Sequence, residues 1–558
     1  MPGQSISTNR YFIALIAALS AFVALSSVRN GFALDDVHII FENARVHSLD
    51  SAWRLFGQTY WPPEEGASLY RPLTMLAFAA QWVIGNGSPL VFHLFSSILF
   101  AATCVAFYLL VEELAGSTVA VLSAALFAIH PVHVEVFANI VGQAEMWVAL
   151  LIFIATLQFV RARRRGGLRP VELLSISVMY IAACMFKEHA VVLPAILVAV
   201  DLIFLGKSEN LRSRARTLVP LILALVATAI VFVAIRSFVT GGFRAGGSNE
   251  LFRDQPFTAR VLTMLTVIVE WVRLLFWPAT LSADYSYPRT RIATSFDISM
   301  LPGILILGSA TLAAWRLRKT NPIVTLCLAW IVVTLAIPSN LLIVTGFVLA
   351  ERTLFLASAA VVILVAVAFE AAWNYASDSG RYAKLATASI VAFMIVAGAA
   401  RSMYRAPVWR DNATLFAQTV EDVPSSSRAH WMFAEYLSQT KGPRASIEEM
   451  LLAVALGKQD DPTLLGFAGD QLSMAGMCPR ATGLYLRALK LTPQNVQLRV
   501  NTSLCLLRLG RLDEARAVAV AGPPDVTADP RVTRTLSLAD SLTTVRDAKA
   551  GVSETRPN

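Results

Sequence analysis

Charged residues are scarce in this sequence. Only 15% of its 558 residues are Asp, Glu, Lys or Arg, whereas 56% are hydrophobic and the mean hydropathy is +0.59. This composition excludes an ordinary soluble globular protein. About 400 residues at the N-terminal end have room for roughly ten membrane spans of ~20 residues each.

Several familiar site signatures are also missing. The five cysteines are scattered and form no metal-ligand or disulfide framework, there is no Gly-rich phosphate loop, and the His/Glu spacing does not match a helical metalloprotease. Lys and Arg outnumber Asp and Glu by 47 to 38, but the excess lies in short loops between apolar runs. Such a pattern indicates membrane orientation and not nucleic-acid binding.

The apolar runs predict an all-α, polytopic membrane bundle of about eleven spans. We keep the first run as an anchored span because no convincing cleavage site follows it. A further run from Arg260 to Pro278 carries Glu270 and Arg273 at mid-depth, where a lipid-facing charge costs at least ~2.5 kcal/mol, so it is expected to be interfacial or packed. The spans are expected near residues 11–28, 90–112, 118–133, 139–160, 171–186, 190–206, 218–238, 298–315, 323–346, 354–374 and 385–402.

Basic loops set the predicted orientation. The segments 161–169 and 207–216 are the densest in Arg and Lys and are expected on the cytoplasmic side. An odd number of spans then places the N-terminus inside and the C-terminal end outside. The membrane domain, residues 1–403, has outer loops at 29–89 and 239–297.

The C-terminal end changes to amphipathic helices with a period of 34 residues, typical of a tetratricopeptide (TPR) α-solenoid. We predict about three repeats in an extracytoplasmic domain over 404–545, followed by a disordered tail at 546–558. The alternative is three helical hairpins packed on the membrane domain. The repeat positions are Gly469, Gly476, Ala481, Tyr485, Ala488 and Pro493, then Gly510, Ala515 and Ala519, and a degraded copy from Ala429 to Leu456 that keeps Gly442.

An acidic pair, Asp35-Asp36, follows the first span at the outer face. A carboxylate in this place has the chemistry to accept a proton from a hydroxyl nucleophile or to hold a cation. The alternative is a helix N-cap, since Asp is a favoured cap.

Further ionisable residues are expected on the same face. Arg71, Lys187 and Arg352 are candidates to neutralise a phosphate. The histidines His130 and His133 either bind the leaving phosphate or form a polar pair that caps the third span, and the charged neighbours either serve the site or pin helix ends as ion pairs. The candidate substrate-binding residues are Arg71, His130, His133, Glu135, Lys187, Glu188, Glu351 and Arg352.

The order of these motifs resembles one family. They are Leu34-Asp35-Asp36, Tyr70-Arg71-Pro72-Leu73-Thr74, Phe92-His93, the segment 130–135, Lys187-Glu188, the segment 281–286 and Glu351-Arg352, with repeats at the end. The chain is similar to the transmembrane and tetratricopeptide-repeat-containing O-mannosyltransferases and their bacterial relatives, within the GT-C glycosyltransferase superfamily. The resemblance covers nearly the whole chain.

The resemblance implies an inverting glycosyltransferase that moves a sugar, a hexose such as mannose, from a polyprenyl-phosphate donor to Ser or Thr of a protein. It implies Asp35 as general base and Asp36 as its neighbour or orienter. The donor is the one cofactor-like molecule required, and a divalent cation is left open. Where relatives often have Arg-Ala-Asp, this chain has Gln143-Ala144-Glu145, which weakens any phosphate contact there.

The expected setting is a bacterial inner membrane, with membrane lipids around the spans and the repeats binding the protein acceptor on the periplasmic side. Two alternatives remain open at this stage. The acceptor is a lipid or a cell-envelope glycan, or the chain is a non-catalytic membrane scaffold whose repeats dock envelope proteins.

Overall fold

The computed structural model describes residues 5–63, 69–205, 210–242, 252, 255–286, 290–457 and 461–554. Within these ranges every regular element is a helix, so the predicted all-α class is confirmed. The chain divides into two compact units, Met1–Tyr285 with Thr290–Leu415, and Ser286–Arg289 with Phe416–Asn558. We call them the membrane unit and the repeat unit.

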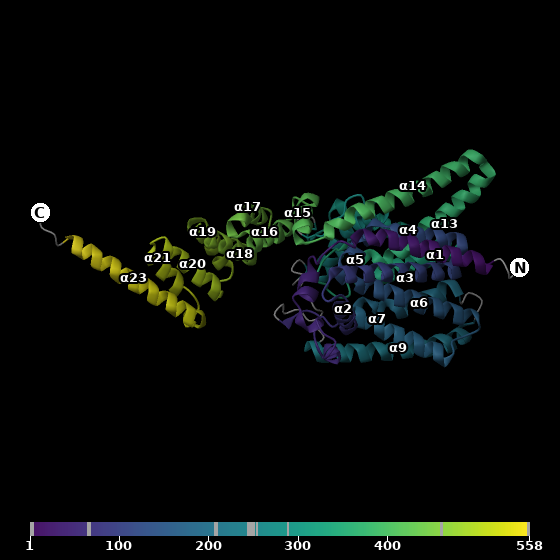
Figure 1. The fold of residues 1–558 in the computed structure, drawn as a ribbon, viewed down its shortest axis with the longest axis horizontal. Helices are drawn as coiled ribbons and strands as arrows, with labels where there is room; N and C mark the ends of the chain where they lie inside the picture. The colour runs from purple at the N-terminus through teal and green to yellow at the C-terminus, as the bar shows by residue number, and fades with distance from the viewer. Residues whose placement is uncertain are drawn as a thin grey trace. The chain divides into compact units, whose positions relative to one another are not determined.

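Long helices of the membrane unit lie side by side along one direction (Figure 1). Helix α3 contacts α1, α4 and α6, and α7 packs between α6 and α9. The principal helices are α1 (Ser5–Ala24), α2 (Pro72–Gly85), α3 (Pro89–Ala115), α4 (Ser117–Ile129), α5 (Val134–Ala138), α6 (Gln143–Arg164), α7 (Pro170–Phe186), α8 (Leu193–Ala199), α9 (Leu211–Thr240), α10 (Phe257–Phe276), α11 (Leu301–Leu317), α12 (Pro322–Leu335), α13 (Phe355–Ser379) and α14 (Arg381–Arg405). Short 3₁₀ or π turns connect them. Helix α15 (Asn412–Asp422) begins in this unit and crosses its boundary at Leu415.

The predicted spans coincide with apolar helices. In the described part of the chain, eight helices are long and apolar enough to cross a membrane, and α4 with the segment 131–138 forms a ninth that bends by 53°. The predicted span at 171–186 falls on the shorter apolar helix α7, and that at 323–346 only partly on α12, which ends at Leu335 and is followed by turns. The chain is therefore an integral membrane protein, and a third short apolar helix, α2, lies within the predicted outer loop 29–89.

Helix α10 corresponds to the apolar run from Arg260 to Pro278, which was not expected to be a simple membrane span because it carries two charged residues. Glu270 and Arg273 bond each other on its surface, with 2.7 Å between Glu270 Oε1 and Arg273 Nη2. Adjacent residues of the helix, Trp271 and Leu274, are buried in a hydrophobic cluster that also includes Leu354. The helix is packed against the bundle, as expected for an amphipathic segment.

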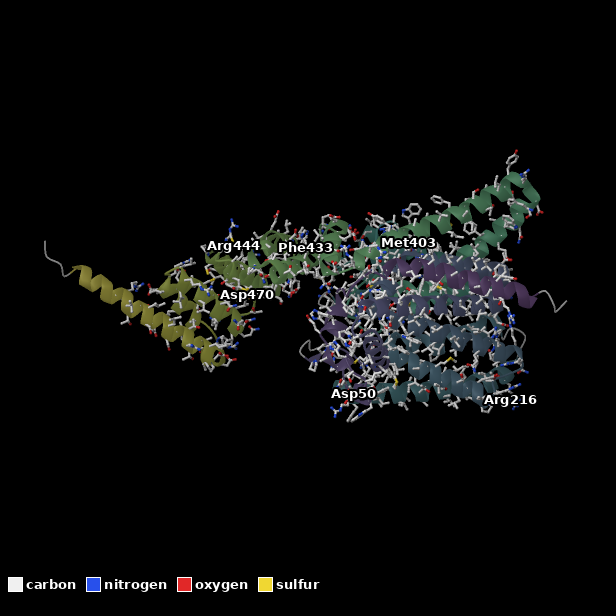
Figure 2. The ribbon with its side chains drawn as sticks, in the orientation of Figure 1. Asp50, Arg216, Met403, Phe433, Arg444 and Asp470 are labelled. Carbon is white, nitrogen blue, oxygen red and sulfur yellow. The ribbon has the colours of Figure 1, made fainter. Side chains whose placement is uncertain are left out.

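The two ends of the membrane unit differ in character. Figure 2 shows Asp50, in the loop after α1, and Arg216, in the basic segment 207–216, at opposite ends of the unit. At the basic end, Arg161 and Arg164 of α6 both bond Glu113 of α3. The predicted separation of a basic face from the 29–89 loop is therefore present in the fold.

The membrane unit continues past the predicted boundary at residue 403. Asn30 Nδ2 donates to the carbonyl of Ala406 at 2.9 Å, and the Gly31 N–H donates to the carbonyl of Arg410 at 2.7 Å. The Leu34 N–H donates to Asn412 Oδ1 at 2.6 Å. These bonds join the segment after α14 to the loop after α1, which explains why the unit extends to Leu415.

The repeat unit contains three helical hairpins that follow one another, each packed on the next. They are α16 (Ser427–Lys441) with α17 (Pro443–Leu456), α18 (Pro462–Met474) with α19 (Cys478–Leu491), and α20 (Val496–Arg508) with α21 (Leu512–Val520). Figure 2 labels Phe433, Arg444 and Asp470, which belong to the first three of these helices. The short α22 (Pro524–Thr527) leads into α23 (Pro530–Glu554), which covers α20 and α21.

The residues of the predicted repeat pattern occupy the positions that the motif requires. Gly469 lies against Tyr485, and an added Cβ would be 2.5 Å from the tyrosine ring. Gly476 adopts a φ of +82° and Gly510 one of +72° in the turns between paired helices, where a side chain would be strained. The predicted disordered tail at 546–558 overlaps α23 as far as Glu554, and its last residues, 555–558, lie outside the described residues.

Candidate functional site

A tight turn presents the acidic pair at the end of the membrane unit away from the basic loops. Leu34 adopts a φ of +54°, which is rare for a residue with a side chain, and the Asp36 N–H closes the turn on the carbonyl of Ala33. The loop behind it packs on α2 and α3 through a small core that includes Ile40, Tyr60 and Phe78. The hydrophobic packing of this loop therefore fixes the position of the turn.

The two aspartates differ in environment. Asp36 is buried, and its carboxylate accepts the N–H of Ile140 at 3.1 Å and that of Val141 at 2.8 Å. Burial raises the pKa of Asp36 to about 7, against the effect of those two bonds. Asp35 keeps 26% of its side chain exposed. Asp36 thus ties the turn to the start of α6, and Asp35 is the carboxylate that a substrate can reach.

Arg352 bridges Asp35 to a second carboxylate. Its Nη1 atom lies 3.4 Å from Asp35 Oδ2 and 3.3 Å from Glu135 Oε1. The backbone N–H of Arg352 also donates to Glu135 Oε2 at 2.9 Å. Three segments, the first loop, α5 and the turn before α13, thereby meet at one guanidinium.

Lys187 follows α7 and forms a second charged group. Its ammonium bonds Glu145 Oε1, and His189 Nε2 lies 3.2 Å from Glu145 Oε2. Burial lowers the pKa of Lys187, and the carboxylate of Glu145 opposes this shift. Glu145 is the acidic residue of the Gln143-Ala144-Glu145 sequence, and it serves here as a partner for cations.

Arg71 forms the third charged group, just before α2. Its Nε atom donates to Glu188 Oε2 at 2.9 Å, and Glu188 Oε1 accepts the N–H of Tyr70 at 3.3 Å. The guanidinium carbon lies 4.9 Å from the centre of the Tyr60 ring, a cation–π geometry.

These three groups form one site. Lys187 and Glu188 are adjacent in the chain, so the Lys187–Glu145 pair and the Glu188–Arg71 pair are neighbours, and Tyr60 packs against Arg71. Lys187 also interacts electrostatically with Arg352. We call this set the polar site; it consists of Asp35, Tyr60, Arg71, Glu135, Glu145, Lys187, Glu188, His189 and Arg352. Each of its cations already has a carboxylate partner.

Three of the predicted site residues have internal partners instead. Glu351 accepts the N–H of Ser282 and the hydroxyl of Tyr285, both at 2.6 Å, and so fixes the 281–286 segment. His130 bonds the carbonyl of Leu275 through Nε2 and accepts the Val132 N–H at Nδ1.

His133 is fully buried, with Nε2 at 2.7 Å from Ser358 Oγ and its ring against Phe127 and Phe355. For both histidines the geometry favours the helix-capping and packing alternative over phosphate binding.

Tyr60 and His189 enter the polar site without having been assigned a role from the sequence. The adjacency of His189 to Lys187-Glu188 was an available signal. Nothing local marked Tyr60, because its place depends on the fold of the whole 29–71 loop.

Gln143 has no charge to offer a substrate and is used for packing. Its side-chain amide forms two reciprocal hydrogen bonds of 2.9 Å with the amide of Gln81 and donates to Ser96 Oγ at 3.0 Å. Among the described residues no group of three or more His, Cys, Asp or Glu side chains is arranged to hold a metal ion.

Known proteins provide an independent comparison. No family model matches the chain. Protein O-mannosyl-transferase TMTC3 of Mus musculus is 23% identical over 457 residues, covering 75% of this chain and 48% of the relative. The chain is similar to the protein O-mannosyl-transferases. The resemblance expected from the motifs is thereby confirmed.

Other mannosyltransferase relatives match in the same way. Protein O-mannosyl-transferase F38B6.6 of Caenorhabditis elegans is 24% identical over 432 residues, with 76% of this chain and 59% of the relative covered. Tmtc2 of Drosophila melanogaster is 29% identical over 289 residues, with coverage of 50% and 31%. The chain thus spans about half the length of the curated relatives it matches.

Among solved structures, the Archaeoglobus fulgidus oligosaccharyltransferase tethered to an acceptor peptide aligns with a TM-score of 0.41 and 13% identity. The alignment covers 71% of this chain and 55% of that chain.

Proposed function

We propose that the protein is an inverting membrane glycosyltransferase that transfers a hexose such as mannose from a polyprenyl-phosphate donor to Ser or Thr hydroxyls of a protein. The observation that carries the proposal is the polar site, in which a partly exposed carboxylate, Asp35, pairs with Arg352 and two further cations, Arg71 and Lys187, belong to the same charged cluster. The names of the relatives support the same chemistry. The setting proposed is a bacterial inner membrane, with the polar site and the repeats on the periplasmic side.

The reaction is a single displacement. The acceptor oxygen attacks the anomeric carbon, the bond from that carbon to the phosphate oxygen breaks, and the configuration inverts. Asp35 takes the hydroxyl proton as general base, a role worth typically 10²- to 10⁴-fold in rate. The lipid phosphate departs with the electron pair, and Arg352, Lys187 and Arg71 stabilise its charge.

Asp36 has a positioning role in this scheme. Its side chain is buried and its two oxygens accept backbone N–H groups of the turn before α6, so it is out of reach of a substrate. The same hydrogen bonds fix the position of the neighbouring Asp35 within the polar site. A positioned base and a lipid-borne donor restricted to the membrane surface both lower the entropic cost of the encounter.

Substitution of the base tests the proposal. Asp35→Asn is expected to lower transfer from a polyprenyl-phosphate hexose to a Ser/Thr-rich protein by about 10²-fold or more, with unchanged yield and thermal stability. Mass spectrometry of the acceptor measures the product. Asp50→Asn is the matched control, because Asp50 lies in the same loop and its carboxylate accepts a hydrogen bond from the nearby Ser48 hydroxyl. Undiminished transfer by Asp35→Asn excludes the catalytic assignment.

A further inference from the structure

Two cysteines from different repeats meet in the interior of the repeat unit. Cys478 begins α19 and Cys505 lies within α20, and their exposed fractions are 4% and 0%. The sulfur atoms are 2.6 Å apart, closer than two unlinked thiols normally approach. The two residues are distant in sequence, and only the stacking of the second repeat on the third brings them together.

The surroundings of the two sulfur atoms are apolar, which favours a buried disulfide. Both cysteines belong to one hydrophobic cluster with Leu465, Leu472 and Tyr485. Ser473 Oγ also lies 3.2 Å from Cys505 Sγ. The other three cysteines are on separate helices of the membrane unit: Cys104 on α3, Cys184 on α7 and Cys327 on α12.

We propose that Cys478 and Cys505 form a disulfide in the mature protein, which joins the second repeat to the third. The oxidant is a disulfide of a thiol oxidoreductase outside the cytoplasm: two cysteine thiols become one disulfide, and the oxidant's disulfide becomes two thiols. The supply of oxidant rests on the extracytoplasmic placement in the proposed function, since disulfides persist in oxidising compartments.

The bond has a clear structural use. An array of three repeats is about the smallest that stacks stably, because each repeat buries its apolar face only against a neighbour. A covalent link across one of the two interfaces restricts the unfolded chain and keeps both repeats in register. Both sulfurs are buried in the folded unit and out of reach of an oxidant, so the bond forms while the repeats are still assembling. Burial also raises the pKa of the Cys505 thiol, which disfavours the reactive thiolate after folding.

Counting of thiols in the full-length protein tests the proposal. Cells are quenched with acid, and free thiols are blocked in denaturant by a mass-tagged maleimide before and after reduction. The chain has five cysteines, so removal of the proposed pair leaves three tagged thiols before reduction and five after it. Five tags before reduction overturn the proposal, as does a reducible dimer in place of the internal bond.

Serine variants are the controls. Cys478→Ser and Cys505→Ser should each show four tags with and without reduction, and Cys184→Ser should show two before reduction and four after it. Reductant is expected to lower the unfolding midpoint of the repeat unit in the wild type and to leave the double serine variant unchanged.

A last experiment distinguishes an error in the positions of the sulfur atoms from an error in the assumed oxidising compartment. If the pair is reduced in cells, the disulfide is absent and the proposal fails; diamide treatment of the purified protein then shows whether the sulfurs or the assumed compartment were misplaced. The transfer assay with Asp35→Asn does not depend on either result, so the two proposals fail separately.

Discussion

At the scale of single residues, Asp35 and Asp36 show how one turn gives neighbouring carboxylates different tasks. The left-handed Leu34 directs the Asp36 side chain inward, onto two backbone N–H groups, while Asp35 remains beside Arg352. The buried member holds the turn, and the exposed member faces the polar site. Substitutions at the two positions should therefore have different consequences.

The pH dependence of stability is expected to report on Asp36. Its pKa is about 7 in the fold and 3.8 when unperturbed, so its contribution to stability is greatest below the lower value and is lost as the pH rises to the upper one. We predict that the unfolding midpoint falls between about pH 5 and pH 7.5, and that Asp36→Asn removes this part of the slope. Thermal scans of detergent-solubilised protein measure it; an identical slope in the variant would contradict the prediction.

Arg352 offers a second test, because one guanidinium serves two carboxylates. Both carboxylates contact the one Nη1 atom. Arg352→Lys keeps the charge but loses the planar guanidinium and the N–H groups that remain for a donor phosphate, so transfer is expected to fall by about 10-fold or more. Truncation to Ala is less informative, since it leaves Glu135 buried without its partner at a cost of about 3–5 kcal/mol.

The double variant Arg352→Gln with Glu135→Gln separates folding from function. It should regain the thermal stability that Arg352→Ala loses while its transfer activity stays low. Recovery of both activity and stability would show that Arg352 acts only in the fold.

The sequence was sufficient to predict that Arg71, Lys187 and Arg352 share one face, because span counting decides which loops lie together. It did not reveal their partners. Glu145 pairs with Lys187 and Glu188 with Arg71, although Lys187-Glu188 are adjacent in the chain. Such pairings depend on helix rotation and depth, which hydrophobic runs do not specify.

At the scale of elements, the repeat helices allow a matched pair of glycine substitutions. Gly469→Ala in α18 places a Cβ 2.5 Å from the Tyr485 ring, whereas Gly483→Ala in α19 meets nothing within 4 Å. We expect the first to destabilise the hairpin by about 1–3 kcal/mol through overpacking. The second should stabilise it by about 0.5–1 kcal/mol because a helical glycine is replaced by alanine.

Hydrogen exchange over α18 and α19 measures both effects in the full chain, without requiring the two units to unfold together. Faster exchange in Gly469→Ala and slower exchange in Gly483→Ala are expected. Equal exchange in the two variants would argue against close packing at Gly469.

The spans and the repeats were predictable because each has a local sequence signal. The signal of a span is a long apolar run, and that of a repeat is a recurring set of small residues. The turns that build the polar site were not predictable. The bend of 53° after α4 and the 3₁₀ turns at Pro131–His133 and Glu351–Leu354 depend on caps and on distant contacts such as those of His130 and Glu351. These irregular segments position the charged side chains.

At the scale of the whole molecule, the two units have separate hydrophobic cores, and the proposed chemistry resides in one of them. Deletion of residues 425–558 is therefore expected to preserve the membrane unit and its transfer to a short Ser/Thr peptide. Transfer to a folded protein acceptor should fall by about 10-fold or more, because effective concentration at the site is lost. Equal loss with both acceptors would argue against a docking role for the repeats, and retained activity on a lipid acceptor would favour the envelope-glycan alternative.

The division at Leu415 could not be predicted from composition alone. The segment after α14 is polar, like the repeats, yet its carbonyls accept bonds from Asn30 and Gly31. Contacts between residues so far apart in the chain leave no local signal.

Arg352 stands between Asp35 and Glu135, and this placement has a kinetic consequence under the proposed function. If a donor phosphate replaces Asp35 at Nη1 of Arg352, loading of the lipid substrate exchanges one anion for another and frees the base at the same step. An acceptor that arrives first meets a carboxylate still engaged with its arginine. We therefore expect an ordered reaction in which the donor enters before the protein, and in which an empty enzyme leaves hydroxyl groups untouched.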